Sequence, residues 1–241
     1  MKKNIVVITG GAGFVGTNLI KRIINKTKYK IISIDNYSSG KITNHVKNKR
    51  ITYLKSQTKN ISKILRNKKK SISALFHFGE FPRIYQSFLH MSECINSNSI
   101  GSFEVFKFCL ENKIKLIYSA TSASLGNKGK DMNLSPYAFI KAKNLEYLEN
   151  LKKWFGFKYE VIYFYNVYGP HHISTGKMAT VIGIFEEAYK KNKPMPVVRP
   201  GNQSRRFTHI DDTIDICLLA WKSDKNSHYI ISNKKSYTIE Q

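Results

Sequence analysis

Tyr137 and Lys141 are the residues whose types and spacing most directly suggest chemistry. They stand four apart in a stretch with a helical pattern, 137–155, so both side chains leave the helix on one face. A tyrosine hydroxyl has an ordinary pKa of about 10, and a neighbouring ammonium favours its phenolate form. Such a pair can take a proton from a substrate alcohol while a hydride leaves the same carbon. The same spacing is common on solvated helix faces, so the interpretation needs support from other elements.

Hydroxyl side chains at the end of an apolar run supply part of that support. Residues 115–119 have the composition of a buried strand, and Ser119 and Thr121 stand at its end, just before the helix of Tyr137. A hydroxyl at this place can share a substrate oxygen with the tyrosine.

A glycine-rich stretch near the N-terminus predicts a phosphate site. Residues 5–8 form a short run of β-branched residues, typical of a strand that is covered on both faces. From Phe14 onward the apolar residues recur with helical spacing. A tight turn between strand and helix aims backbone N–H groups and the positive end of the helix at an anion. The turn contains Gly10, Gly13 and Gly16.

An acidic residue follows at the distance expected for a dinucleotide site. A second apolar strand, 30–35, ends in Asp35, about where a carboxylate binds a ribose in such folds. The combination favours a dinucleotide site over a purely structural turn.

Composition excludes several classes of protein. The 241 residues are 41% hydrophobic, which suits a globular α/β protein, and no apolar run is long enough to span a bilayer. We expect a cytoplasmic protein with no membrane partner. Its three cysteines are widely spaced and predict buried thiols and no metal site. They are Cys94, Cys109 and Cys217.

The formal charge of +24 would suit a nucleic-acid surface, but its distribution does not. Only seven of the 40 basic residues are arginine, and the lysines are spread along the chain without interleaved aromatic residues. We therefore expect small anionic ligands and no nucleic-acid partner.

The order of elements predicts an α/β fold, a Rossmann-type doubly wound parallel sheet with a small C-terminal substrate lobe. Further strands are expected at 51–54, 74–78 and 160–164, and helices at 61–65, 91–112 and 137–155. Ser135 can cap the last of these helices, with Pro136 in its first turn. The alternation stops after Gly169, where only 180–190 and 211–221 read as helices. Residues 1–165 are expected to form the dinucleotide-binding domain and 166–241 the lobe.

These motifs resemble the extended short-chain dehydrogenases/reductases, in the family of NAD-dependent nucleotide-sugar epimerases and dehydratases. The resemblance implies NAD as cofactor, a nucleotide-diphosphate sugar as substrate, and a homodimer formed through the helices at 91–112 and 137–155. The matching segments occur in family order and cover nearly the whole chain: 9–16, Asp35 with Asn36, 77–79, Asn98 with Gly101, 119–126, Tyr137 with Lys141, 163–170, and 203–207 leading to Asp211 and Asp212.

The resemblance also implies roles for individual residues. Tyr137 would be the base, Lys141 its partner, and Thr121 the third catalytic residue. Asp35 would bind the adenosine ribose, which favours NAD over NADP. The full cofactor set is Gly10, Gly13, Phe14, Val15, Gly16, Asp35, Asn36, Gln57, Phe78, Gly79, Asn98, Ser119, Tyr137, Lys141 and Phe164. The substrate set is Glu80, Ser87, Thr121, Tyr137, Asn166 and Arg205.

Four positions depart from the family pattern. Gln57 stands close to where an aspartate often contacts adenine, and its amide can still hydrogen-bond the base. Ser122 and Ala123 replace the acidic pair of 4,6-dehydratases, which disfavours that reaction because elimination of water needs an extra acid and base. Glu80 stands where many epimerases have a small residue. It is either an acid that faces the substrate or a rim residue that pairs with Arg83.

The resemblance leaves three functions open. The first is an epimerase that oxidises the sugar transiently at C4. The second is a 4,6-dehydratase that uses Glu80, and the third is a catalytically silent NAD-binding regulatory protein. Residues 232–240 resemble the strand and turn that precede the last helices of the family, so a fragment or a shortened protein is expected.

Overall fold

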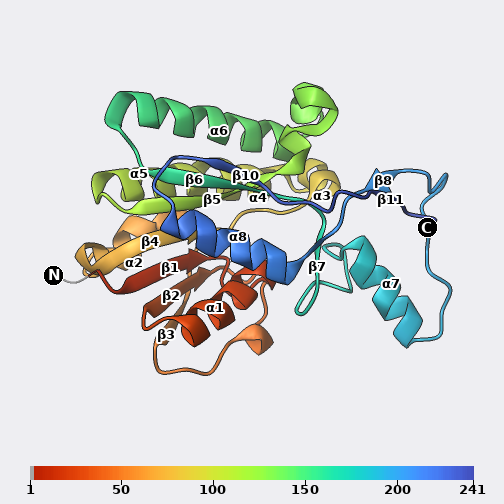
Figure 1. Ribbon diagram of the computed structural model, residues 1–241, viewed down its shortest axis with the longest axis horizontal. Coiled ribbons are helices and arrows are strands. Elements are labelled where there is room, and N and C mark those ends of the chain that lie inside the picture. Colours follow the sequence, from red (N-terminus) through yellow and green to blue (C-terminus); the bar gives the residue numbers. More distant parts are fainter. Residues whose placement is uncertain (1–2) are drawn as a thin grey trace.

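A seven-stranded parallel sheet forms the centre of the protein (Figure 1). This computed structural model describes residues 3–241, and of residues 126–129 only the backbone. The strand order is β10-β6-β5-β4-β1-β2-β3, with β4 crossing over to pair with β1. All five residues of β1 are buried, as its apolar run predicts for a strand covered on both faces. The strands are β1 Ile5–Thr9, β2 Lys30–Asp35, β3 Ile51–Lys55, β4 Ile72–His77, β5 Lys115–Thr121, β6 Tyr159–Phe164 and β10 His228–Ile230.

Helices cover both faces of the sheet, which confirms the predicted doubly wound fold (Figure 1). On one face lie α1 (Phe14–Lys26) and α8 (Ile210–Lys222), joined to the sheet by one apolar cluster. On the other lie α2 (Ile61–Leu65), α5 (Ser102–Glu111) and α6 (Pro136–Phe155). Buried apolar residues recur every three or four positions along these helices, so each helix packs one apolar stripe against the sheet. The three cysteines are buried and unpaired, as expected.

The predicted helix 91–112 is not one regular helix. It consists of α4 (Met91–Cys94), a π-helical turn η4 (Ile95–Gly101) and α5. Apolar spacing does not distinguish a π turn from an α turn, because the extra residue per turn shifts the pattern only locally. A short helix that was not predicted, α3 (Ile84–Leu89), precedes it. Shorter 3₁₀ turns are η1 Ile42–Asn44, η2 Thr58–Asn60, η3 Lys69–Ser71, η5 Ser122–Ser124 and η6 Gly126–Asn133.

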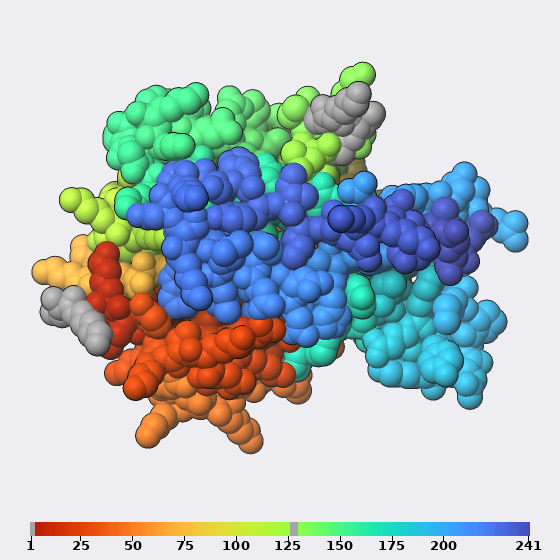
Figure 2. Space-filling view, in the orientation of Figure 1, coloured from red at the N-terminus to blue at the C-terminus, as the bar shows by residue number. Residues whose placement is uncertain are grey.

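The C-terminal third divides between the sheet layers and the cleft. The predicted boundary at residue 166 is wrong for α8 and β10, because α8 packs on α1 and β10 pairs with β6. Arg22 of α1 forms ion pairs with Asp211 and Asp215 of α8. Figure 2 shows this blue C-terminal segment lying against the red N-terminal layer. The remaining elements lie to one side of the sheet (Figure 1): α7 Val181–Lys190, and two small sheets that pair β7 (Val167–Tyr168) with β9 (Thr208–His209) and β8 (Ser204–Arg205) with β11 (Tyr237–Thr238).

Within residues 3–241, no helix is both long and apolar enough to span a bilayer.

The start of α6 depends on a side-chain cap. Ser135 Oγ accepts a hydrogen bond from Ala138 N at 3.1 Å, and Pro136 occupies the first turn, as predicted. We expect Ser135→Ala to lower the free energy of unfolding by about 1 kcal/mol, because Ala138 N–H loses its acceptor in a buried place. Urea unfolding followed by circular dichroism measures the change. Ser92→Ala, at an exposed position of α4, is the control and should stay within about 0.5 kcal/mol of the parent. Equal effects of the two substitutions would contradict the capping role.

Candidate active site

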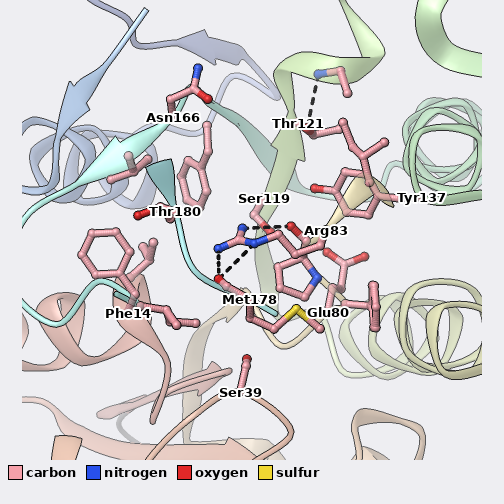
Figure 3. A pocket seen from close by; sticks show the side chains of 18 of the residues that line it. Phe14, Ser39, Glu80, Arg83, Ser119, Thr121, Tyr137, Asn166, Met178 and Thr180 are labelled. Atoms are coloured by element: carbon pink, nitrogen blue, oxygen red, sulfur yellow. Dashed lines mark hydrogen bonds between the residues drawn. The ribbon is translucent and has the colours of Figure 1, made fainter. Parts of the chain in front are cut away.

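A large cleft opens where the parallel strands end. Its volume is about 1600 Å³, and its walls come from the carboxyl ends of the strands and from segments that include residues 164–167, 178–182 and 203–207 (Figure 3). Parallel strands present their carboxyl ends at the same edge of a sheet, so this is the expected place for a ligand.

The glycine turn forms one side of the cleft and has no room for side chains. Gly10 has φ +71°, and a Cβ there would lie 2.8 Å from the Phe78 backbone. A Cβ on Gly16 would lie 2.2 Å from the Gly10 carbonyl oxygen. The start of α1, whose N-cap is Gly13, can therefore lie close to the backbone of the glycine turn. The unpaired N–H groups at this helix end suit a pyrophosphate.

Asp35 is fixed at the edge of the same cleft. It is only 7% exposed, and its carboxylate accepts hydrogen bonds from Ala12 N at 2.9 Å and Tyr37 N at 2.8 Å. The backbone thus aims the carboxylate, as binding of ribose hydroxyls requires. Together with the glycine cradle, these residues fit a dinucleotide.

Of the fifteen residues predicted to contact the cofactor, the structure brings all but one to the cleft wall. The exception is Asn98, which is fully buried and does not line the cleft. Its amide accepts from Phe81 N at 2.5 Å and donates to Phe81 O at 2.9 Å, while its carbonyl accepts from Asn144 at 2.7 Å. The prediction that Asn98 lines the cleft is wrong, because the π-helical turn directs it to the segment after β4.

Thr121 and Tyr137 line the cleft from neighbouring elements (Figure 3). Thr121 ends β5, and its hydroxyl accepts from Ala123 N at 3.2 Å. Tyr137 lies in the first turn of α6, where its backbone N–H donates to Ser87 Oγ at 3.3 Å. Both residues thus line one cleft, and the sharing of a substrate oxygen by their two hydroxyls stays a prediction.

Ser87 does not reach the substrate region. It is fully buried, lies behind the cleft wall, and donates its hydroxyl proton to Ile84 O at 2.6 Å. The prediction that Ser87 contacts the sugar is therefore wrong. Its hydroxyl instead accepts a hydrogen bond from the backbone N–H of Tyr137 at the start of α6 and so helps to position this residue.

Lys141 is held inside the wall. Its side chain is 4% exposed, and its ammonium donates to the Glu80 carboxylate and to Ser119 O. It also lies 4.6 Å from the centre of the Tyr118 ring, within cation–π range. Both Lys141 and Tyr137 line the cleft, and support of the Tyr137 phenolate by this ammonium stays a prediction.

The predicted pairing of Glu80 with Arg83 is wrong, because Arg83 donates to Met178 O and Pro82 O. Glu80 lines the cleft with a side chain that is 3% exposed, and an acid that faces the substrate stays a prediction. The carboxylate also accepts from Ser102 Oγ at 2.8 Å and Tyr118 OH at 3.1 Å. A carboxylate that is buried away from water needs such partners. The sequence alone does not show that Lys141 is one of them.

Burial keeps the titratable neighbours of this pair neutral. It lowers the pKa of His77 to about 4 against a smaller opposing effect of Glu80, and it raises the pKa of Cys94 to about 11, with a smaller contribution from Glu80 in the same direction. Burial also raises the pKa of Tyr118 well above its ordinary value.

The far side of the cleft carries the remaining polar groups (Figure 3). Asn166 donates to Arg206 O at 3.0 Å, and Arg205 donates to Ser204 O at 2.9 Å; both line the cleft, as predicted for substrate contacts. Sequence reasoning missed Arg83 and Met178 as cleft residues. The Arg83 guanidinium ties α3 to the Met178 carbonyl, and no sequence motif marks that contact.

The close packing of Gly10 predicts that a larger residue at this position weakens NAD binding. In Gly10→Ala, the new methyl meets Phe78 and Gly79 backbone atoms at 2.8–2.9 Å in a strained conformation, so the turn must shift. We expect at least about tenfold weaker NAD binding by isothermal titration calorimetry, the equivalent of about 1.4 kcal/mol. Gly156→Ala is the matched control, with φ +65° and no atom within 4 Å of the new methyl. It should lose stability but keep its NAD affinity. An unchanged affinity in Gly10→Ala would contradict the placement of the pyrophosphate.

Comparison with known proteins agrees with the geometry. A putative UDP-glucose 4-epimerase of Methanocaldococcus jannaschii is 24% identical over 231 residues, which are 91% of this chain and 74% of that protein. The crystal structure of the Thermotoga maritima UDP-glucose 4-epimerase with UDP-glucose superposes with a TM-score of 0.90 at 26% identity, over 98% of this chain and 79% of that one. A UDP-N-acetylglucosamine 4-epimerase of Methanobrevibacter ruminantium, in complex with UDP-N-acetylmuramic acid, gives a TM-score of 0.88 at 30% identity, over 100% and 80%.

The family assignment covers both the glycine turn and α6. Residues 6–232 match the family described as "NAD dependent epimerase/dehydratase family". NAD is thus the cofactor for this cleft, and the protein is an enzyme of this family. The chain belongs to the NAD-dependent epimerase/dehydratase family.

Proposed function

We propose that the protein is a nucleotide-sugar epimerase that acts by transient oxidation at sugar C4. The observation that carries the proposal is the meeting of Thr121 and Tyr137 in one cleft with the glycine turn and Asp35. Relatives named as 4-epimerases of UDP-sugars support the same reaction.

The residues of the chain divide the work at the reacting carbon. Tyr137 as phenolate takes the proton of the 4-hydroxyl and later returns it, and Thr121 steadies the same oxygen through a hydrogen bond. The glycine turn and Asp35 would hold NAD, which when bound would supply the acceptor and donor of the C4 hydride. The 4-keto sugar turns between the two transfers, so the hydrogen returns to its opposite face. Lys141 supplies the positive charge that favours the phenolate.

The nucleotide part of the substrate would lie on the C-terminal side of the cleft. Arg205 offers a cation for a diphosphate, and Asn166 offers an amide beside it. The exposed position of Arg205 suits a substrate that enters and leaves in each cycle.

A 4,6-dehydratase is the second candidate, and one observation counts against it. That reaction needs an additional acid and base near C5 and C6. The Glu80 carboxylate is committed to Lys141, Ser102 and Tyr118, and positions 122 and 123 carry no acid. The third candidate, a silent NAD-binding regulatory protein, predicts NAD binding without turnover of any sugar.

A homodimer would cover an apolar face of the α3–α6 side. The helix α6 packs on η4, and large apolar side chains on these elements are between 40% and 71% exposed. Exposed apolar side chains on neighbouring elements are typical of an interface between subunits. Its members are Ile84, Tyr85, Phe88, Leu89, Met91, Ile95, Ile100, Phe103 and Phe139.

The epimerase proposal predicts that Tyr137→Phe loses at least about a hundredfold in turnover, because the general base is removed. UDP-glucose and UDP-N-acetylglucosamine are suitable first substrates, with the C4 epimer measured by chromatography. NAD binding of the variant, measured separately, should stay near that of the parent. Near-normal turnover in Tyr137→Phe would reject the mechanism, and a 4-keto-6-deoxy product would favour the dehydratase.

The dimer proposal predicts that Ile100→Glu gives a monomer in sedimentation velocity, because the carboxylate would be buried unpaired between subunits. Tyr189→Glu is the control, since Tyr189 lies on α7, is 73% exposed and is outside this face. A parent protein that sediments as a monomer at all concentrations would contradict the dimer.

A further inference from the structure

The mechanism proposed above leaves one buried acid without a task. Glu80 and Lys141 form an ion pair with side chains 3% and 4% exposed, in the wall between the end of β4 and α6. A buried pair contributes little net stability compared with apolar residues of the same volume. Its presence beside the catalytic tyrosine therefore calls for a functional reason.

The pair is one end of a directed chain of hydrogen bonds. Ser102 Oγ donates its one proton to Glu80, so toward His77 it can only accept, at 2.9 Å. The His77 proton is then on Nε2, which leaves Nδ1 to accept from Thr9 Oγ1 at 2.7 Å. Each of these side chains is fully buried. Every proton in the chain thus has one defined direction, from Thr9 toward Glu80.

The other end of the chain lies under the dinucleotide turn. Thr9 Oγ1 accepts from Gly79 N at 3.0 Å and from Phe78 N at 3.2 Å. Gly10 packs against the same segment, where a Cβ would lie 2.8–2.9 Å from Phe78 C and O and from Gly79 N. The position of Lys141 is therefore linked through side chains to the floor of the NAD site.

Few charges face the pair. Tyr118 from β5, His77 from β4, Cys94 from α4 and Tyr137 from α6 are the titratable groups around it. The first three are neutral near pH 7, as their buried environments dictate. On the cleft side, Arg83 is bonded to backbone carbonyls. Among the described residues, Glu80 is thus the negative charge that compensates Lys141.

We propose that Glu80 is a positioning residue that holds the Lys141 ammonium charged and in place, and ties it to the dinucleotide turn through Ser102, His77 and Thr9. The inference rests on the proposed function, because it explains how the ammonium beside Tyr137 is maintained. Lysine has a flexible four-carbon stem and loses its proton readily when it is buried alone. The carboxylate prevents both the loss of the proton and the movement of the amine.

The sign of the pH effect follows from charge. Removing a negative charge makes every nearby acid lose its proton at a lower pH. Glu80→Gln should therefore move the alkaline limb of the pH profile of kcat, where Lys141 loses its proton, toward lower pH by about one unit, with kcat reduced at least about tenfold. Glu80→Asp keeps the charge on a shorter stem, so it should lower kcat without moving the profile. A purely structural role would lower activity in both variants and shift neither profile.

Glu93→Gln is the matched control. Glu93 also lines the cleft, but its side chain is 65% exposed and its carboxylate lies near His90, not Lys141. It should leave the profile in place. A profile of Glu80→Gln that coincides with that of the parent would overturn the proposal, provided that Tyr137→Phe is inactive in the same assay. Activity in Tyr137→Phe would instead reject the proposed function.

A second measurement needs no substrate. In Glu80→Gln, burial favours the neutral amine of Lys141, whereas the unfolded chain keeps an ammonium up to its ordinary pKa of about 10.4. The unfolded state then binds more protons, so the stability of the variant rises with pH in this range and its deficit in Tm relative to the parent shrinks between pH 7 and pH 10. The double variant Glu80→Gln/Lys141→Met should melt above Glu80→Gln. A Tm deficit that is constant with pH, or no recovery in the double variant, would overturn the proposal even if no sugar is turned over.

Discussion

The contact between the glycine turn and the backbone after β4 is the constraint on which the cleft depends. Gly10 can lie against Phe78 and Gly79 only because neither glycine carries a side chain, and a Cβ on Gly79 would lie 2.8 Å from Gly10 N. The pairing of β1 with β4 brings these two turns together, and Thr9 holds them through its hydroxyl. The N-terminus of α1 and the wall that carries Glu80 are therefore parts of one packed unit.

Polar groups behind the cleft form a network in which each partner restricts the next. The Glu80 carboxylate satisfies Ser102, Tyr118 and Lys141, and the carbonyl of Ser119 accepts from the same ammonium. A buried network of this kind is stabilising only when all its members are satisfied, because each unpaired group would retain its cost of desolvation. In this protein the network lies between the glycine turn and α6, so it can set the geometry of both.

The opposite side of the cleft is built differently. There, Asn166, Arg205 and the segment around Met178 come from short strands and loops, and their contacts are largely with backbone carbonyls. Such contacts hold a loop without the dense apolar packing of the sheet layers. The two sides of the cleft therefore differ in how they are held, one by the packed sheet layers and the other by contacts between loops.

The sequence by itself determined the parallel sheet, the glycine turn, Asp35 at the end of β2, and the order of Thr121, Tyr137 and Lys141. These features are local: each depends on the composition of one strand, the spacing of one helix or the conformational freedom of a glycine. Only the tertiary structure decided the partners of buried polar groups. Asn98 turned away from the cleft because η4 is π-helical, Ser87 became a support for α6, and α8 and β10 joined the sheet rather than the lobe. Glu80 forms an ion pair with Lys141, which is 61 residues away in the sequence, because the sheet places the end of β4 beside α6. A single sequence contains no signal for such a pairing. The pairing depends on which side chains are buried next to each other after the layers have packed.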